Sequence, residues 1–145
     1  MSSTIKQILK DVTFKVLETM FFSLPEPCDA SPNEDWDLYA GIKLQGPEEI
    51  TLHLFLHKEL AVKLAADFLG TEHEEIAAEA LLDMMKEMVN MIGGNLLTRL
   101  DSQTCLSLGV PESRFVTGHR FEKFREENQI AIQVNDKFMR VAWNR

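Results

Sequence analysis

Residues 83–95 read DMMKEMVNMIGGN, and this stretch decides how the rest of the chain is interpreted. When residues 81–100 are placed about 100° apart around a helix axis, the large apolar side chains share one broad arc. They are Leu81, Leu82, Met84, Met85, Met88, Val89, Met91 and Ile92. The spacing predicts an amphipathic helix that runs from about Glu74 to Leu100 and buries this apolar arc.

The opposite side of the predicted helix is polar. It carries Asp83, Lys86, Glu87, Asn90 and Gly94. Glu87 and Asn90 are three residues apart, so their side chains are neighbours on the helix surface. Each glycine of the Gly93–Gly94 pair costs about 1 kcal/mol relative to alanine in a helix interior. Two interpretations are open: the glycines let another molecule approach the helix, or they permit close packing against a neighbouring helix.

The pattern becomes less regular after the glycines. Asn95 and Arg99 fall into the arc that is apolar upstream. Either the helix bends at the glycines, or its burial changes there.

The remaining segments alternate between helical and strand periodicity. We expect helices at 4–22 and 58–70, a loop at 25–35, and strands at 36–44, 50–56, 114–121, 129–135 and 137–144. Thr71 and Glu74 form a candidate capping box for the long helix. This order predicts an α+β fold, a mostly antiparallel sheet with a long central helix pair packed on it, in a single domain spanning 1–145.

Composition excludes several classes of function. The net charge of -8, from 15 Lys+Arg against 23 Asp+Glu, argues against a nucleic-acid partner. The N-terminal segment has no continuous apolar core, so we expect a cytoplasmic protein without a membrane partner. Cys28 and Cys105 form no zinc motif, and His53 and His57 are roughly 13 Å apart on a strand, so no metal site is predicted.

Familiar catalytic motifs are absent from the sequence. The chain contains no G-x-S-x-G nucleophile motif, no phosphate-binding P-loop and no dinucleotide fingerprint. Catalysis on a small molecule therefore has little support from the sequence.

The central helix resembles a known family. Asp83, Glu87 and Asn90 fit the (Asp/Ser)-x3-Glu-x2-Asn signature of the CheC/CheX/FliY phosphatases, bacterial chemotaxis proteins that dephosphorylate the response regulator CheY. The following segment, MIGGNLLT (91–98), also looks like the continuation in that family. The order of helices and strands agrees with the fold that this resemblance implies.

A weak internal repeat bears on the number of sites. FKVLETMFFSL in the first helix resembles MKEMVNMIGGN, but Phe14, Glu18 and Phe21 occupy the three signature positions. CheC-type members usually carry two active-site helices, whereas CheX carries one and is known as a homodimer. The closer resemblance is to CheX, which implies a single site and a homodimer. The strands at 129–135 and 137–144 have apolar residues on both alternations, which suits a sheet extended across a subunit interface, and an ordinary buried strand would show the same pattern.

The resemblance also implies roles for individual residues. Asn90 would hold the attacking water, and Glu87 would pair with a lysine of the phosphorylated CheY-like receiver. Asp83 would be a peripheral contact to this partner, and Gly94 together with Gly93 would let its backbone approach. The enzyme would need no cofactor of its own, because Mg²⁺ belongs to the phosphorylated partner. The alternative is a non-catalytic dimeric adaptor of the same fold in a signalling or flagellar switch assembly.

Overall fold

The computed structural model describes residues 2–28, 35–73, 76–100, 106–119, 121 and 124–145. Its helices are α1 (Ser2–Met20), α2 (Lys58–Leu69) and α3 (Ala78–Leu100), with a short 3-10 helix η2 (Glu126–Asn128). Its strands are β1 (Pro25–Cys28), β2 (Leu38–Gln45), β3 (Ile50–Leu56), β4 (Ser107–Leu108), β5 (Glu112–Phe115), β6 (Gln129–Val134) and β7 (Lys137–Asn144). The predicted α+β class is confirmed.

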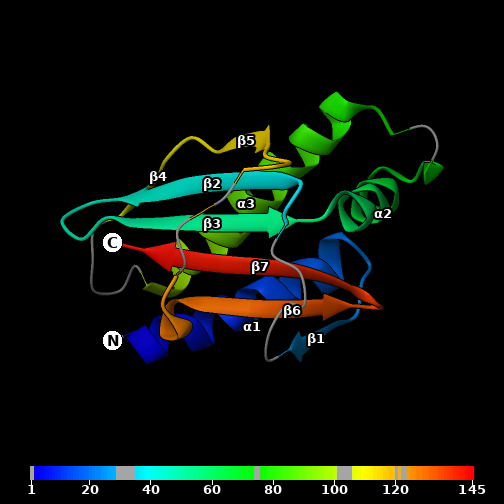
Figure 1. Ribbon diagram of the computed structural model, residues 1–145. Helices are drawn as coiled ribbons and strands as arrows, with labels where there is room; N and C mark the ends of the chain where they lie inside the picture. The colour runs from blue at the N-terminus through cyan, green and yellow to red at the C-terminus, as the bar shows by residue number, and fades with distance from the viewer. Residues whose placement is uncertain (1, 29–34, 74–75, 101–105, 120, 122–123) are drawn as a thin grey trace.

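The seven strands form one sheet in which every strand pair is antiparallel. Its order is β1-β6-β7-β3-β2-β4, and β5 pairs beside β4 along the outer side of β2. In Figure 1 the helices α1 and α3 lie behind the sheet, and α2 lies beyond its end. Asn135, at a positive φ of 58°, lies in the tight turn between β6 and β7.

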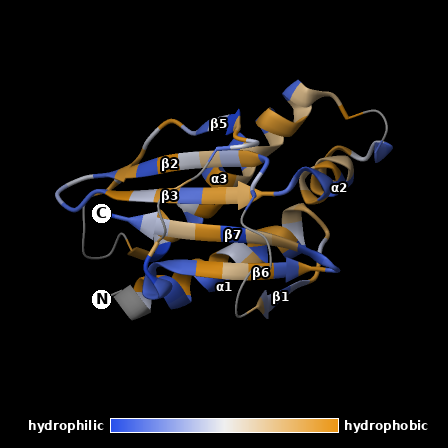
Figure 2. Cartoon of the chain, viewed as in Figure 1, coloured by the Kyte–Doolittle hydropathy of each residue, from blue (hydrophilic) through white to orange (hydrophobic). Residues whose placement is uncertain are grey.

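Side chains alternate between the two faces of the sheet because successive residues of a strand point to opposite sides. On β3, Leu52, Leu54 and Leu56 belong to the core shared with the helices, whereas Phe55 belongs to a smaller aromatic cluster. Figure 2 shows this alternation as hydrophobic and hydrophilic bands along β2 and β3. Both faces of the sheet therefore carry packed side chains.

Two predictions for the N-terminal half of the chain need correction. Residues 25–28 form strand β1 rather than a loop, paired with residues 131–134 of β6. The partner strand is about a hundred residues away, so local composition gives no sign of it, and edge strands tolerate proline. The long helix begins at Ala78 rather than near Glu74, and Glu74 lies outside the described residues. Because Ile76 and Ala77 are not helical, Thr71 is too far from the start of the helix to cap it.

Two further corrections concern the C-terminal strands. The strand predicted at 114–121 ends at Phe115, and Gly118 has a φ of 86°, a left-handed conformation that turns the chain. Residues 131–134 of β6 pair with both β1 and β7, and residues 139–142 of β7 pair with both β6 and β3. These strands therefore cannot extend the sheet into a second subunit, and their double apolar pattern reflects a place inside the sheet.

Candidate functional site

Helix α3 lies across the sheet and carries the residues that the sequence singled out. Its buried residues are Leu81, Met84, Met85, Met88, Val89, Ile92, Gly93 and Leu96. They contact the sheet, mainly β2, and the neighbouring helices α1 and α2. The predicted apolar arc is therefore confirmed as the helix face that packs into the core.

The outer face of α3 presents a row of polar groups. Asp83, Lys86 and Glu87 are exposed, and Asn90 is half-buried one turn further along the helix. In the described part of the chain, no hydrogen bond or ion pair engages the side chain of Glu87 or Asn90. A carboxylate and a carboxamide thus stand side by side on a helix surface, with their hydrogen-bonding groups available to another molecule.

The two glycines have different surroundings. Gly93 is buried, and a Cβ atom built on it would lie 3.1 Å from both Ile42 Cγ2 and Leu108 Cδ1. Its missing side chain therefore allows α3 to pack closely on the sheet, not on a helix, and its placement gives no support to a contact with a partner. A Cβ atom built on Gly94 would meet only the side chain of Leu108, at an ordinary van der Waals distance of 3.9 Å. Gly94 is also partly exposed.

Burial, not a break in the helix, explains the irregular pattern after the glycines. The helix continues without interruption to Leu100. Asn95 is exposed, and its amide donates a hydrogen bond of 2.7 Å to the carbonyl oxygen of Met91. Arg99 is exposed as well, while Leu96 stays buried. The buried arc is simply narrower in the last turns of α3.

The corresponding residues of α1 do not form a second site. Phe21, which occupies the position of Asn90 in the internal repeat, is fully buried. Its ring stacks on Phe68 of α2 with centroids 5.0 Å apart. Glu18 is exposed, but no amide stands beside it, and Phe14 is half-buried against the core. Of the two helices, only α3 therefore has a glutamate followed one turn later by an asparagine on its outer face.

Comparison with known proteins identifies the family and the fold of this chain. Residues 38–135 match the family model for the chemotaxis phosphatase CheX. A comparison with curated proteins found no significant sequence match.

Solved structures show the same fold over nearly the whole chain. CheX from Desulfovibrio desulfuricans is 19% identical, with a TM-score of 0.79 over 97% of this chain and 98% of that one. CheX from Vibrio vulnificus is 18% identical, with a TM-score of 0.79 over 99% of both chains. A complex of CheX with CheY, BeF₃ and Mg²⁺ from Borrelia burgdorferi contains a chain 16% identical, with a TM-score of 0.76 over 96% of this chain and 97% of that one.

The match of residues 38–135 to the family model identifies the class of protein as a chemotaxis phosphatase. The chain belongs to the CheX family of chemotaxis phosphatases, since the family model covers most of its length. The resemblance seen in the sequence and the enzyme class that it implied are both confirmed.

Proposed function

We propose that this protein hydrolyses the aspartyl phosphate of a CheY-like receiver domain and so ends a chemotaxis or other two-component signal. The observation that carries the proposal is the unengaged pair of Glu87 and Asn90 on the outer face of α3. Family membership supports it, and so does the Borrelia relative, which was crystallised with CheY, BeF₃ and Mg²⁺.

Asn90 supplies the group that positions water. In hydrolysis the water oxygen attacks phosphorus, the bond from phosphorus to the aspartate oxygen breaks, and inorganic phosphate and a free carboxylate result. For phosphoryl transfer, positioning and charge stabilisation provide most of the catalysis. The carboxamide of Asn90 offers both a donor and an acceptor, so it can hold a water in line without acting as a general base.

Glu87 fixes the helix on the receiver. A carboxylate one turn from Asn90 can form a charge-assisted hydrogen bond with a lysine while the amide reaches the water. Asp83, one further turn toward the N-terminus and exposed, is the peripheral contact. Gly94 has no side chain, so the partner's backbone can approach the helix surface next to Asn90. We leave Gly93 out of the contact surface because it is buried against the sheet.

The metal in the proposed reaction belongs to the receiver. Mg²⁺ bound there would offset negative charge on the phosphoryl group. The described residues of this chain contain no group of three or more His, Cys, Asp or Glu side chains that could hold a metal ion. In this proposal the enzyme contributes Glu87 and Asn90, and the receiver contributes the phosphate and its ion.

We further propose that the protein is a cytoplasmic homodimer, as the resemblance to CheX implies. No helix in the described part of the chain is long and apolar enough to cross a membrane. Strand β1 lies at one edge of the sheet, with β6 as its neighbour among the described strands. Light scattering on a size-exclusion column tests the dimer, because a mass near 16.6 kDa would indicate a monomer.

The competing function is a non-catalytic adaptor of the same fold. A scaffold has no need for a carboxylate and an amide held together on an exposed helix face. Membership in a phosphatase family also favours catalysis.

The decisive experiment follows the decay of a radiolabelled, phosphorylated CheY-like receiver. We expect wild-type protein to accelerate the decay and Asn90→Ala to lower the rate by about 100-fold, because misplacing a reacting group costs that order of rate. Circular dichroism checks that both proteins fold. Asn95→Ala is the matched control, since Asn95 is an exposed asparagine of the same helix whose amide bonds to its own backbone. An Asn90→Ala variant as fast as wild type would refute the mechanism, and no acceleration by wild type with any receiver of its organism would favour the adaptor.

A further inference from the structure

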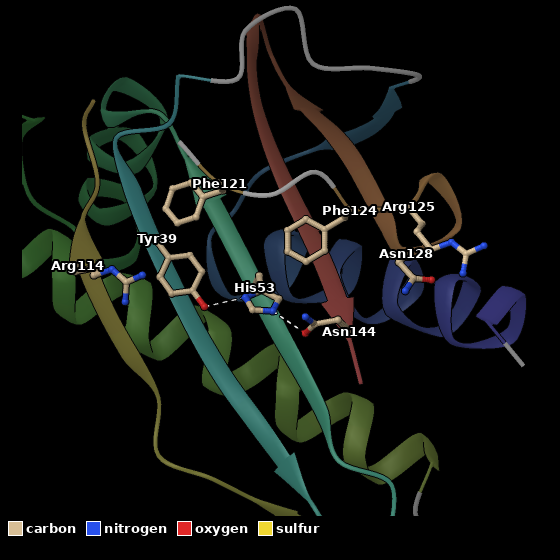
Figure 3. Close-up of a pocket in the computed structure, with 8 residues that line it drawn as sticks. All are labelled: Tyr39, His53, Arg114, Phe121, Phe124, Arg125, Asn128 and Asn144. Atoms are coloured by element: carbon tan, nitrogen blue, oxygen red, sulfur yellow. Dashed lines mark hydrogen bonds between the residues drawn. The ribbon is translucent and has the colours of Figure 1, made fainter. Parts of the chain in front are cut away.

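The sheet face turned away from the helices carries a pocket of about 410 Å³, a size typical of small-molecule sites. Its lining residues are Tyr39, His53, Arg114, Phe121, Phe124, Arg125, Asn128 and Asn144. Figure 3 shows their side chains gathered over strands β2, β3 and β7. The proposed phosphatase residues on α3 are on the other side of the sheet, so this pocket is a separate feature.

A row of three hydrogen-bonded side chains forms the floor. The Tyr39 hydroxyl lies 2.8 Å from His53 Nδ1, and His53 Nε2 lies 2.9 Å from Asn144 Oδ1. A carboxamide oxygen only accepts hydrogen bonds, so His53 Nε2–H donates to Asn144 Oδ1. His53 Nδ1 then accepts a hydrogen bond from the Tyr39 hydroxyl. Burial lowers the pKa of His53 and raises that of Tyr39, which keeps both groups uncharged near neutral pH. The floor is therefore polar, neutral and fixed, and the Asn144 amide nitrogen still has hydrogens to donate.

Two phenylalanine rings form an aromatic wall. Phe121 stacks on Tyr39 with centroids 5.8 Å apart and planes 17° apart. Phe124 lies 5.1 Å from the His53 ring, measured between centroids. Both rings pack against the aromatic cluster that includes Phe55. This wall offers flat apolar surface to a ring of another molecule.

Among the described residues that line the pocket, the charged ones are two arginines. Arg114 holds its guanidinium 4.7 Å from the centre of the Tyr39 ring. Figure 3 places Arg114 and Arg125 at opposite ends of the polar row. Each arginine has one ion pair outside the lining, with Glu112 and Glu127 respectively, both at 3.1 Å. All four of these side chains are at least half exposed, and exposed pairs contribute little, so an incoming anion can replace the carboxylate.

We propose that this pocket binds a small aromatic oxyanion, a flat ring system that carries a carboxylate, phosphate or sulfonate group. The ring packs against Phe121 and Phe124, and the oxyanion accepts hydrogen bonds from an arginine fork. The polar row of His53 and Asn144 meets the edge of the ring. The two arginines give the pocket lining cationic groups that complement a negatively charged ligand.

A fluorescent aromatic sulfonate, 8-anilinonaphthalene-1-sulfonate, is a suitable probe for titration against the full chain. We expect one molecule to bind per chain, and its Kd to rise at least about 10-fold in Arg114→Gln/Arg125→Gln, because hydrogen bonds to charged groups are strong. The uncharged analogue N-phenyl-1-naphthylamine should bind at least about 10-fold more weakly, and sulfate alone should fail to displace the probe. Asn90→Ala should bind the probe normally, which separates this site from the phosphatase site.

Two controls locate the bound probe. Arg99→Gln removes an exposed arginine on α3 and should leave the Kd unchanged. Phe22→Asn removes an exposed phenylalanine from the surface near the end of α1, where Leu24 is also exposed, and should keep the signal. The His53 imidazole proton resonances of the wild-type chain should move on probe addition, a readout that needs no variant to fold.

Three results would overturn the proposal. An unchanged Kd in the folded double arginine variant would show that the arginines do not bind the sulfonate. Equal affinity for the uncharged analogue would show that the pocket binds apolar rings without recognising the anionic group. Loss of the signal in Phe22→Asn, or an unmoved His53 resonance, would place the probe elsewhere.

Discussion

Helices α1 and α3 pack side by side on the same face of the sheet, yet only α3 presents a candidate catalytic pair (Figure 1). Both helices bury an apolar face, and both expose a glutamate, Glu18 on α1 and Glu87 on α3. Three residues further on, α1 has the buried Phe21 where α3 has the half-exposed Asn90. The comparison teaches that the fold supplies a surface, and that a single position on it decides whether there is a site.

The ends of the two helices explain this difference. Helix α1 stops at Met20, so Phe21 lies beyond its last turn and packs against Phe68. Asn90 lies in the middle of a helix that continues for ten more residues to Leu100. Glu87 and Asn90 can therefore share a rigid helix surface on α3. The residue with the same spacing from Glu18, Phe21, lies after the end of α1 and is buried in the core.

The largest difference between the helices should appear when each glutamate is neutralised. We expect Glu87→Gln to lower the phosphatase rate at limiting enzyme by about 30-fold, because a hydrogen bond between charged groups contributes about 2 kcal/mol. Glu18→Gln, the matched change on α1, should leave the rate unchanged. Decay of the phosphorylated receiver at several enzyme concentrations measures both variants, and binding to the unphosphorylated receiver separates docking from turnover. Equal losses in the two variants would mean that the acidic surface as a whole steers the partner.

A smaller effect should separate the two glycines of α3. Replacing glycine by alanine in a helix interior gains about 1 kcal/mol at either position. At Gly93 the added Cβ meets Ile42 and Leu108 at 3.1 Å, whereas Gly94 has room. Gly94→Ala should therefore be more stable than Gly93→Ala by about 1 kcal/mol in urea unfolding, since overpacking a core costs at least that much. Equal stabilities would show that the sheet adjusts freely beneath α3.

Gly94 also tests the partner surface. A leucine at this position adds a large side chain one turn beyond Asn90, on the outer face of the helix. We expect Gly94→Leu to fold and to bind the phosphorylated receiver more weakly by steric block. Surface plasmon resonance with a BeF₃-activated receiver measures this loss, with Gly94→Ala as the control of smaller volume. Unweakened binding by the leucine variant would place the receiver away from this end of α3.

Periodicity predicted the elements whose signals are local. The arc of methionines on α3, the β2–β3 pair and the glycine that ends α2 at Gly70 all follow from neighbouring residues. Strand β1 was missed because its pairing with β6 depends on residues about a hundred positions away. The predicted start of α3 was wrong because the sequence offers a capping pattern at Thr71 and Glu74, whereas the actual start at Ala78 has no such pattern.

The candidate residues on α3 were found because a family motif marks them. Periodicity alone could place Glu87 and Asn90 on the outside, but it gave the same status to Lys86. The different roles of Gly93 and Gly94 needed the structure, since only the position of Ile42 and Leu108 distinguishes them. The pocket around His53 had no sequence signal, because strands β2, β3, β5 and β7 supply one residue each and the other lining residues come from segment 121–128, far from most of them in the sequence.

The smallest effect concerns how α1 ends. Phe22 has a φ of 53° and is 72% exposed, so its side chain buries little while its backbone adopts a left-handed conformation that costs about 1 kcal/mol or more. Phe22→Gly removes that cost but raises the entropy of the unfolded chain, so we expect a net stabilisation below about 1 kcal/mol in urea unfolding. Lys15→Gly, a control change at an exposed position in the interior of the same helix, should destabilise by about 1 kcal/mol. If both variants lose stability equally, the packing of the Phe22 ring must outweigh the strain of its backbone. The left-handed conformation of Phe22 would then not explain why α1 ends before Phe21.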